Sequence, residues 1–171
     1  DGSAEVLATN SIIGKVLPAG SVFNRIAAES NSNSDDVIVQ RVIGAPTIAK
    51  LEITGEISEP IILSRNPLGV EKAEYSRIQV VAKKHSVSTV ILENSGEALL
   101  AEDLEIVLEA EATLTFISLQ EFSIDSVYAA RHHAIIGKDA KFKSITVTIG
   151  GSLVRILPTV EFKEPGGEAD M

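Results

Sequence analysis

Two adjacent histidines, His132 and His133, are the side chains in this 171-residue chain that most readily suggest chemistry. They follow Arg131 in a run typical of a β-strand. Neighbouring residues of a strand point to opposite faces of the sheet, so the two imidazoles cannot bind one metal ion together. We expect one to face the interior of the fold and the other to face solvent. The third histidine, His85, falls at a predicted turn and is expected at the surface.

Gln120 closes another predicted strand. Inside a β-rich fold its amide would need hydrogen-bond partners, and we expect it to stack in a polar ladder. Five carboxylates are interpreted as a solvated acidic face, with corner and strand positions alternating outward: Glu102, Asp103, Glu105, Glu109 and Glu111. Their spacing does not assemble the cluster of acids that a polysaccharide-cleaving enzyme requires.

The remaining motifs exclude several chemistries. Gly150-Gly151 and Gly166-Gly167 follow predicted strands, but neither pair fits a phosphate-binding loop, and both are interpreted as backbone bends. Ser123 and Ser126 lack the glycines of a nucleophile elbow. The chain has no cysteine, which excludes disulfides, thiolate metal sites and a cysteine nucleophile. We therefore expect no catalytic residue, no metal ligand and no bound cofactor in this segment.

Strands must position these side chains. Isoleucine (20) and valine (16) dominate the composition, which is typical of strands. Ten β-branched runs are the candidates: Val37–Val42, Ile48–Ile53, Pro60–Leu63, Ile78–Ala82, Val87–Leu92, Leu104–Leu108, Thr113–Leu119, Ala134–Ile136, Phe142–Ile149 and Leu153–Phe162. Near the start, Ser21–Glu29 instead predicts a short helix with Ser21 as its N-cap, followed by a polar loop over residues 30–36.

Three segments repeat a pattern of strand, polar corner and second strand. A small residue occupies each corner, namely Ser86, Ala112 and Ala140, at spacings of 26 and 28 residues. A period in this range without crossover helices is typical of a solenoid. Two strands per unit predict a β-helix, in which each strand stacks on its counterpart one unit later. An ordinary β-sandwich is the alternative, but hairpin turn pairs are scarce, with only Asp1-Gly2 present.

The length fits one domain, divided into an N-terminal segment over residues 1–36 and a β-helix core over residues 37–171. The chain starts without methionine and ends in a turn-rich stretch, so we expect a fragment whose β-helix is truncated at its C-terminal end. The open rim of the last coil then predicts self-association.

The charge and the hydropathy pattern narrow the range of partners. A net charge of −9 and a pI of about 4.8 argue against binding to nucleic acid or to anionic membrane surfaces. The sequence has no apolar run of 18 residues, so no membrane-spanning helix is predicted. The lack of cysteine and of a targeting segment favours the cytoplasm.

A set of motifs, densest after Phe116, carries a family resemblance. They are Gly55–Leu63, Phe116–Phe122, Ala129–Ala134, Gly137–Ala140, Gly150-Gly151 with Arg155, and Gly166-Gly167 with Glu168. Together they resemble the SufB/SufD family, the scaffold proteins of the SUF iron–sulfur cluster assembly system. The last two glycine motifs are the most specific.

The resemblance implies a right-handed parallel β-helix flanked by helical regions and a non-enzymatic scaffold role. For this chain we therefore predict a right-handed parallel β-helix with a small N-terminal α/β segment. SufD relatives pair with SufB and bind the ATPase SufC, and the iron–sulfur cluster belongs to the parent complex. SufB relatives typically have tryptophan two residues after the glutamine that matches Gln120. Phe122 occupies that place, so the resemblance is closer to SufD of the actinobacterial kind. A SufB-like subunit is one alternative, and a polysaccharide-active β-helix enzyme is an alternative from another class.

The resemblance also suggests interior residues of interest. In SufB relatives, polar residues that line the interior of the β-helix have been proposed as a route for sulfur, and Gln120 and His132 match such positions loosely. The SufC-docking region and a functional histidine of SufD relatives would lie beyond Met171. Without a cysteine in these coils, the resemblance places the sulfur chemistry elsewhere in the parent protein or on its partners.

Overall fold

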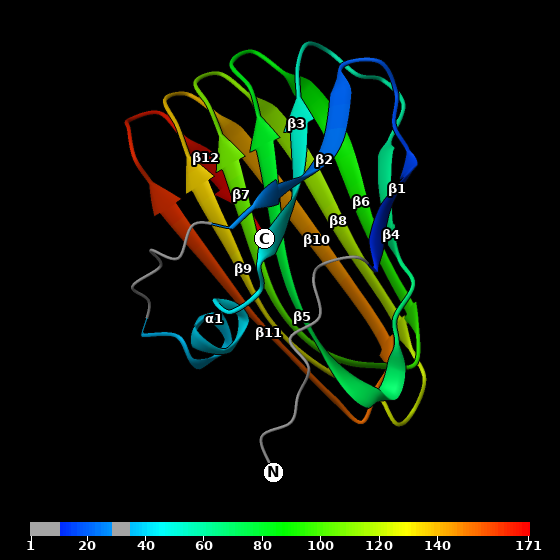
Figure 1. Cartoon of the computed structure of the whole chain (residues 1–171). Helices are drawn as coiled ribbons and strands as arrows, with labels where there is room; N and C mark the ends of the chain where they lie inside the picture. The colour runs from blue at the N-terminus through cyan, green and yellow to red at the C-terminus, as the bar shows by residue number, and fades with distance from the viewer. Residues whose placement is uncertain (1–10, 29–34) are drawn as a thin grey trace.

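Two six-stranded sheets face each other in the described part of the chain and form a parallel β-solenoid of about five turns (Figure 1). The computed structural model describes residues 11–28 and 35–171. Strand accounts for 66% of the structure and helix for 4%. The repeat-based prediction of a β-helix is therefore confirmed, and the β-sandwich alternative is wrong.

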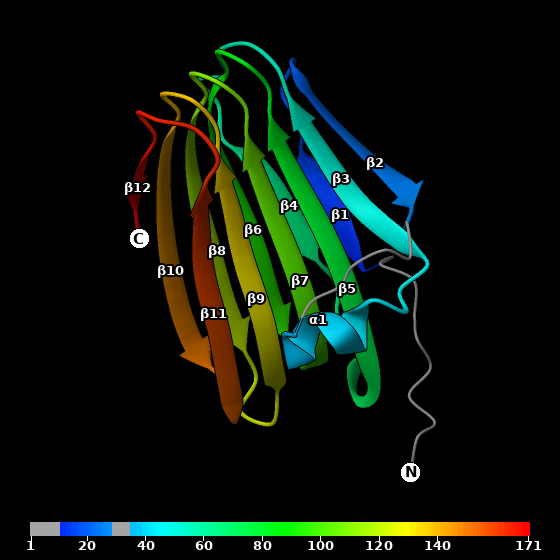
Figure 2. The ribbon, with the colours of Figure 1, turned by 90° about the vertical axis from the view of Figure 1, so that its left-hand side faces the viewer.

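Each turn of the solenoid contributes one strand to each sheet, and the two sheets have separate strand orders. Sheet A contains, in order, β1 (Ile12–Val16), β4 (Ile61–Arg65), β6 (Val87–Gly96), β8 (Thr113–Phe122), β10 (Lys141–Gly150) and β12 (Glu168–Asp170). Sheet B contains β11 (Leu153–Phe162), β9 (Val127–Ile136), β7 (Ala98–Leu108), β5 (Gly69–Ala82), β3 (Thr47–Ile53) and β2 (Ser21–Ala27). Figure 2 shows the strands of successive turns lying side by side.

Long parallel ladders hold the turns in register. Thr113 of β8, for example, pairs with Val87 of β6 on one side and with Lys141 of β10 on the other. Strand residues alternate between an outward and an inward position, and the inward apolar residues form a large core cluster and a smaller one around Phe122 and Tyr128. In contrast, β1 and β2 pair antiparallel with β4 and β3, so they form the first, non-repeating layer at the N-terminal end of the solenoid.

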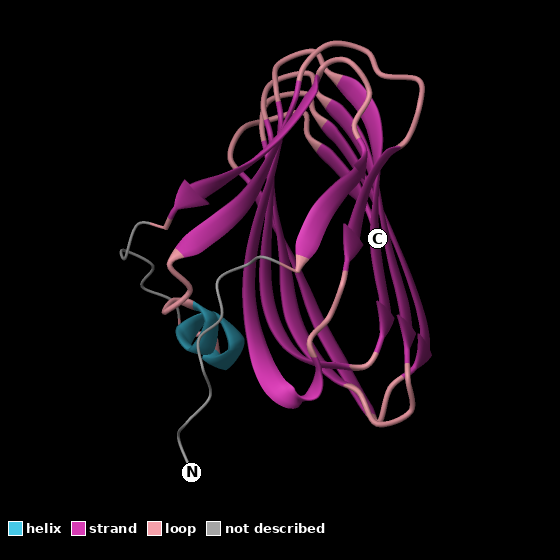
Figure 3. Cartoon of the chain, turned by 45° about the vertical axis from the view of Figure 1, so that its right-hand side comes forward, coloured by secondary structure: helices cyan, strands magenta, loops and turns pink. Residues whose placement is uncertain are grey.

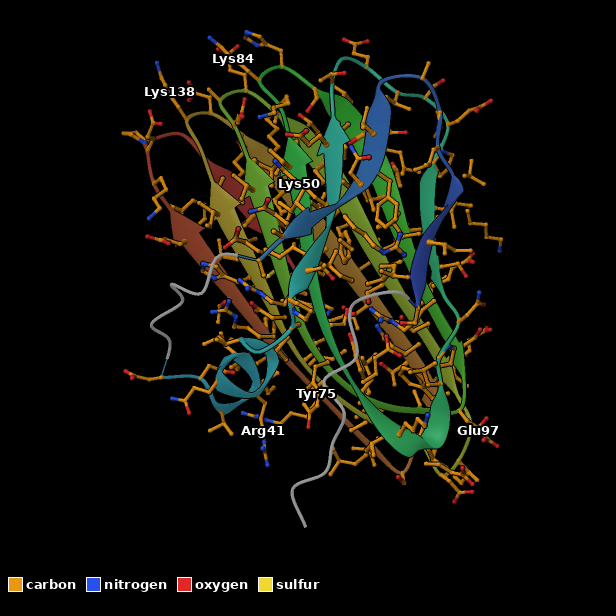
Figure 4. The ribbon with its side chains drawn as sticks, in the orientation of Figure 1. Arg41, Lys50, Tyr75, Lys84, Glu97 and Lys138 are labelled. Carbon is orange, nitrogen blue, oxygen red and sulfur yellow. The ribbon has the colours of Figure 1, made fainter. Side chains whose placement is uncertain are left out.

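The corners between sheet B and sheet A explain the small residues of the repeat. Ser86, Ala112 and Ala140 are fully buried there, where a larger side chain would meet the next turn. The residue before each has a left-handed backbone, with φ of 61° at His85, 59° at Glu111 and 52° at Asp139. Figure 4 shows this row of corners, where Lys84 and Lys138 project into solvent. The exposed position predicted for His85 is confirmed.

The helix predicted over Ser21–Glu29 is wrong for the described residues 21–28. Residues Ser21–Ala27 form strand β2, which pairs with β3 along its whole length. The hydroxyl of Ser21 donates to the carbonyl of Pro18, 2.6 Å away, and so closes a turn instead of capping a helix. Backbone pairing with β3 and the packing of Phe23 against the core outweigh the local helical propensity here.

The strand predicted over Val37–Val42 is also wrong, because these residues form the helix α1 (Val37–Val42). The carboxylate of Asp36, in the predicted polar loop, caps this helix by accepting from the backbone N–H groups of Ile38 and Val39. Ile38, Val39 and Val42 are buried, and the helix lies on the outer face of sheet B over β5, β7 and β9 (Figures 2 and 3). Tertiary packing thus converts a β-branched run into a short helix. Residues 30–34 of the predicted loop lie outside the described residues.

The other nine candidate strands overlap β3 to β11 and are confirmed, although several extend further than predicted. β5 is the extreme case, since it starts at Gly69 and not at Ile78. Among the described residues, no helix is long and apolar enough to cross a membrane.

Candidate functional site

A fully buried arginine, Arg65 at the end of β4, lies at the centre of a polar cluster inside the solenoid. Its guanidinium donates to the Glu74 carboxylate at 2.9 Å through Nη1 and forms a close ion pair with Glu102 through Nη2. The side-chain exposures are 0% for Arg65, 4% for Glu74 and 0% for Glu102. The cluster joins strand β4 of sheet A to strands β5 and β7 of sheet B across the interior.

Neutral side chains accept the remaining guanidinium protons. Nε donates to the Asn94 amide oxygen, Nη1 to the Ser11 hydroxyl and Nη2 to the Ser76 hydroxyl, each at 2.9 Å. All five N–H donors of Arg65 therefore have an acceptor, which is the full capacity of a guanidinium. Lysine has only three donors and could not make this set of contacts.

A hydrogen-bonded chain leads from this cluster toward the C-terminal turns. The Tyr128 hydroxyl donates to Oε1 of Glu102 at 2.7 Å and lies 3.4 Å from Nε2 of His132. Because the tyrosine proton is committed to Glu102, the His132 ring must donate through Nε2 to make the second contact. The ring also meets Phe116 edge to face, with 6.2 Å between centroids.

Burial determines the protonation states of Tyr128 and His132. It lowers the pKa of His132, against the opposing effect of the Glu102 carboxylate, so the imidazole is neutral at pH 7. Burial together with Glu102 raises the pKa of Tyr128 well above its ordinary value, so the hydroxyl keeps its proton. The three side chains thus place one neutral imidazole and one phenol next to the buried carboxylate of Glu102.

Gln120 belongs to a second polar row, on the inner face of sheet A. It pairs in register between Asn94 of β6 and Thr148 of β10. Its amide nitrogen donates to the Ser118 hydroxyl in a close contact, and its oxygen accepts from Thr148 at 2.9 Å. The amide is therefore satisfied by neighbours on the same sheet, as the predicted polar ladder requires.

The structure places both predicted interior candidates inside the solenoid, with exposures of 0% for Gln120 and 7% for His132. It does not bring them into one hydrogen-bonded group, because Gln120 bonds within sheet A and His132 bonds toward Glu102. His133 points outward, as expected for one residue of the pair, and its Nδ1 lies 2.8 Å from the Thr159 hydroxyl.

Sequence reasoning missed the centre of the cluster, namely Arg65, Glu74, Glu102 and Tyr128. The signal was present in the alternation of strand residues. Arg65 shares the inward parity of Ile61 and Leu63 on β4, and all three are buried. The same counting places Glu102 inward.

The predicted solvated acidic face is wrong at two of its five positions. Glu102 points into the core, and Asp103 is only 6% exposed. Asp103 faces outward, but it lies under α1 and accepts from Arg131 at 2.7 Å. Burial raises the pKa of Asp103 and Arg131 opposes that effect. Glu105 and Glu109 are half-buried, and Glu111 is exposed as expected.

The glycine motifs lie at bends near the last turn. Gly150, Gly151 and Gly166 have φ of 80°, 81° and 81°, which confirms their interpretation as backbone bends. Arg155 on β11 is exposed, and Glu168 on β12 is exposed and lies 4.0 Å from the Lys141 ammonium. These motif residues therefore shape the backbone or face solvent, and they lie apart from the Arg65 cluster.

No group of three or more potential metal-ligating side chains is gathered anywhere in residues 11–28 and 35–171. The interior cluster instead holds one cation, Arg65, whose five donors are all satisfied, beside the two carboxylates of Glu74 and Glu102. The fold and this interior define the class of protein: a parallel β-solenoid with a polar, charge-bearing interior.

Comparison with known proteins identifies the family to which this β-solenoid belongs. The family model described as "SUF system FeS cluster assembly, SufBD core domain" matches residues 65–171, which span β5 to β12 and Arg65 itself. The chain belongs to the SufBD family. No solved structure shows significant similarity to it.

Two curated relatives show the extent of the similarity. An iron–sulfur cluster assembly SufBD family protein of Mycobacterium leprae is 29% identical over 161 residues, covering 92% of this chain and 38% of the relative. The SufBD family protein of Mycobacterium bovis is 28% identical over 148 residues, covering 86% of this chain and 35% of the relative. The chain thus spans less than two-fifths of the length of these relatives.

Proposed function

We propose that this chain is the early β-helix portion of a SufD-like scaffold protein that takes part in iron–sulfur cluster assembly with a SufB-like scaffold and a SufC-like ATPase. The observation that carries the proposal is the match of the SufBD core domain to residues 65–171, on a chain that folds as a β-solenoid. Phe122 favours the SufD-like assignment over a SufB-like one. It is 6% exposed and packs against Tyr128, with 5.3 Å between ring centroids.

A non-catalytic role fits the chemistry of the residues. The chain has no cysteine to carry sulfur or to bind a cluster, so the cluster would be held elsewhere in the parent complex. Carboxylates on the outer wall of sheet B are paired across strands. Glu109 pairs with Lys83 at 2.9 Å, and Glu105 accepts from the Gln79 amide at 2.7 Å. Such pairing supports a scaffold over a polysaccharide-active enzyme, which needs acids free to act on a substrate.

Contacts with other chains are the expected mode of action. In the described residues, β11 pairs only with β9, and β12 covers only the first three residues of β10. These free edges support self-association of this chain, because an unpaired strand edge is a template for another strand. We place the protein in the cytoplasm, without nucleic-acid or membrane partners.

Co-purification tests the proposal. The full-length parent, carrying an affinity tag, is expressed with the SufB-like and SufC-like proteins of the same organism, and the eluted proteins are identified by mass spectrometry. We expect both to be retained, and an unrelated tagged β-solenoid serves as the control. Absence of both partners would refute the assignment. Retention of the SufC-like protein without the SufB-like one would point to a SufB-like subunit instead.

A further inference from the structure

The Arg65 cluster contains one cation and two carboxylates. The groups that face one another there come from six strands and from Ser11, the residue before β1. They are Arg65 on β4, Glu74 and Ser76 on β5, Asn94 on β6, Glu102 on β7, Phe116 on β8, and Tyr128 and His132 on β9. Only Arg65, Glu74 and Glu102 carry charge when ionised, because His132 and Tyr128 are neutral at pH 7. With both carboxylates ionised, the interior would hold a net charge of −1.

An uncompensated negative charge is costly at this depth. The side chains of Glu74 and Glu102 are 4% and 0% exposed, so water solvates them poorly. A buried carboxylate without its own counter-charge takes up a proton in preference to remaining ionised. One arginine can serve as counter-charge to one of these two groups.

The hydrogen bonds distinguish the two carboxylates. Glu102 receives a donor on each oxygen, the Tyr128 hydroxyl on Oε1 and Nη2 of Arg65 on Oε2, which suits the ionised form. Glu74 receives Nη1 of Arg65 and the Ser11 hydroxyl on the same oxygen, Oε1. That arrangement leaves Oε2 of Glu74 to carry a proton.

We propose that the solenoid interior is a proton-binding site, in which Glu74 retains one proton on Oε2 at pH 7 and makes the Arg65 cluster electrically neutral. The pKa of Glu74 moves in the direction of the protonated form: burial raises it above its ordinary value, Arg65 opposes the shift and Glu102 adds to it. This inference is independent of the proposed role in cluster assembly.

The proposed Glu74 proton makes the free energy of unfolding depend on pH, and the direction of that dependence can be stated. Since the native state holds the Glu74 proton more tightly than the unfolded chain does, its stabilising effect is complete below pH 4.5, the ordinary pKa. It is lost as pH rises through the native pKa. The Glu74→Gln variant is permanently neutral at this position and similar in shape, so it lacks this loss.

Urea unfolding of the wild type and of Glu74→Gln across pH 5 to 8 measures the effect. We expect the ratio of their unfolding constants to shift in favour of Gln as pH rises above 4.5, by up to tenfold per pH unit within the window of titration. Glu97→Gln, at the exposed corner between β6 and β7 (Figure 4), is the matched control and should show a nearly constant ratio.

A second measurement needs no variant to fold. Carbon-13 NMR of wild-type protein labelled at the glutamate carboxyl carbons should show, at pH 7, one carboxyl at the chemical shift of the protonated acid, assigned to Glu74. Ionised shifts for every glutamate at pH 7, or assignment of the protonated signal to Glu102, would overturn the proposal. A ratio of the unfolding constants of Glu74→Gln and wild type that stays constant from pH 5 to 8 would also overturn it.

Discussion

Replacing Arg65 by methionine tests whether the interior charges hold the turns of the solenoid together. The change keeps a flexible apolar side chain of similar length but removes the cation and five hydrogen-bond donors. It leaves Glu102 buried at 0% exposure without a counter-charge. Removing one partner of a buried ion pair costs about 3–5 kcal/mol. A domain of this size has a total stability of about 5–15 kcal/mol, so the loss should be obvious.

The assay is urea unfolding followed by far-UV circular dichroism at pH 7, with the free energy of unfolding obtained by linear extrapolation. Arg41→Ala is the matched control, because Arg41 is exposed on α1 (Figure 4) and its loss should change stability by no more than about 0.5 kcal/mol. Adding Glu102→Gln to Arg65→Met should recover about 1 kcal/mol or more relative to the sum of the single changes, because the orphaned charge is gone. A loss below about 1 kcal/mol for Arg65→Met, or strict additivity in the double variant, would refute the reasoning.

Three further predictions concern individual residues. Because burial lowers the pKa of His132, its stabilising effect is present above pH 6.5 and is lost as pH falls. The wild type should therefore lose up to about 1.4 kcal/mol per pH unit relative to His132→Gln below pH 6.5, and equal pH profiles in urea unfolding would contradict this. Glu111→Gly should raise the free energy of unfolding by about 0.5–1 kcal/mol, since Glu111 has a φ of 59° that glycine adopts without strain; an unchanged thermal midpoint would count against it. Gly150→Ala should cost about 2–3 kcal/mol, because an added Cβ would lie 1.9 Å from the carbonyl oxygen of Phe122 and φ is 80°. Gly55→Ala, with φ of 73° but open space around the Cβ, should cost only about 1 kcal/mol, and equal losses for the two variants would show that the contact with Phe122 is unimportant.

Local patterns failed where one element lies against another. The run Val37–Val42 has the composition of a strand, yet it forms a helix because Asp36 caps it and three of its side chains are buried against sheet B. Ser21–Ala27 has helical spacing, yet it pairs with β3. In both cases the deciding partner is distant in sequence, and secondary-structure propensities of less than about 1 kcal/mol per residue cannot compete with it.

The repeat pattern alone was enough to predict the solenoid and its corners. Small residues recur at Ser86, Ala112 and Ala140 because each corner packs against the next turn, and that constraint is written in every repeat. The sequence also indicated that His132 and His133 face opposite ways and that no thiolate chemistry is present.

The polar content of the interior, in contrast, became visible only in the folded chain. Arg65, Glu74 and Glu102 lie on three different strands, and each resembles a solvated surface residue when taken alone. The fold brings them together inside the solenoid, where two carboxylates on sheet B share one arginine on sheet A. The acidic residues could therefore be recognised in the sequence. Which of them are buried and which face solvent depends on the register of the strands in the whole fold.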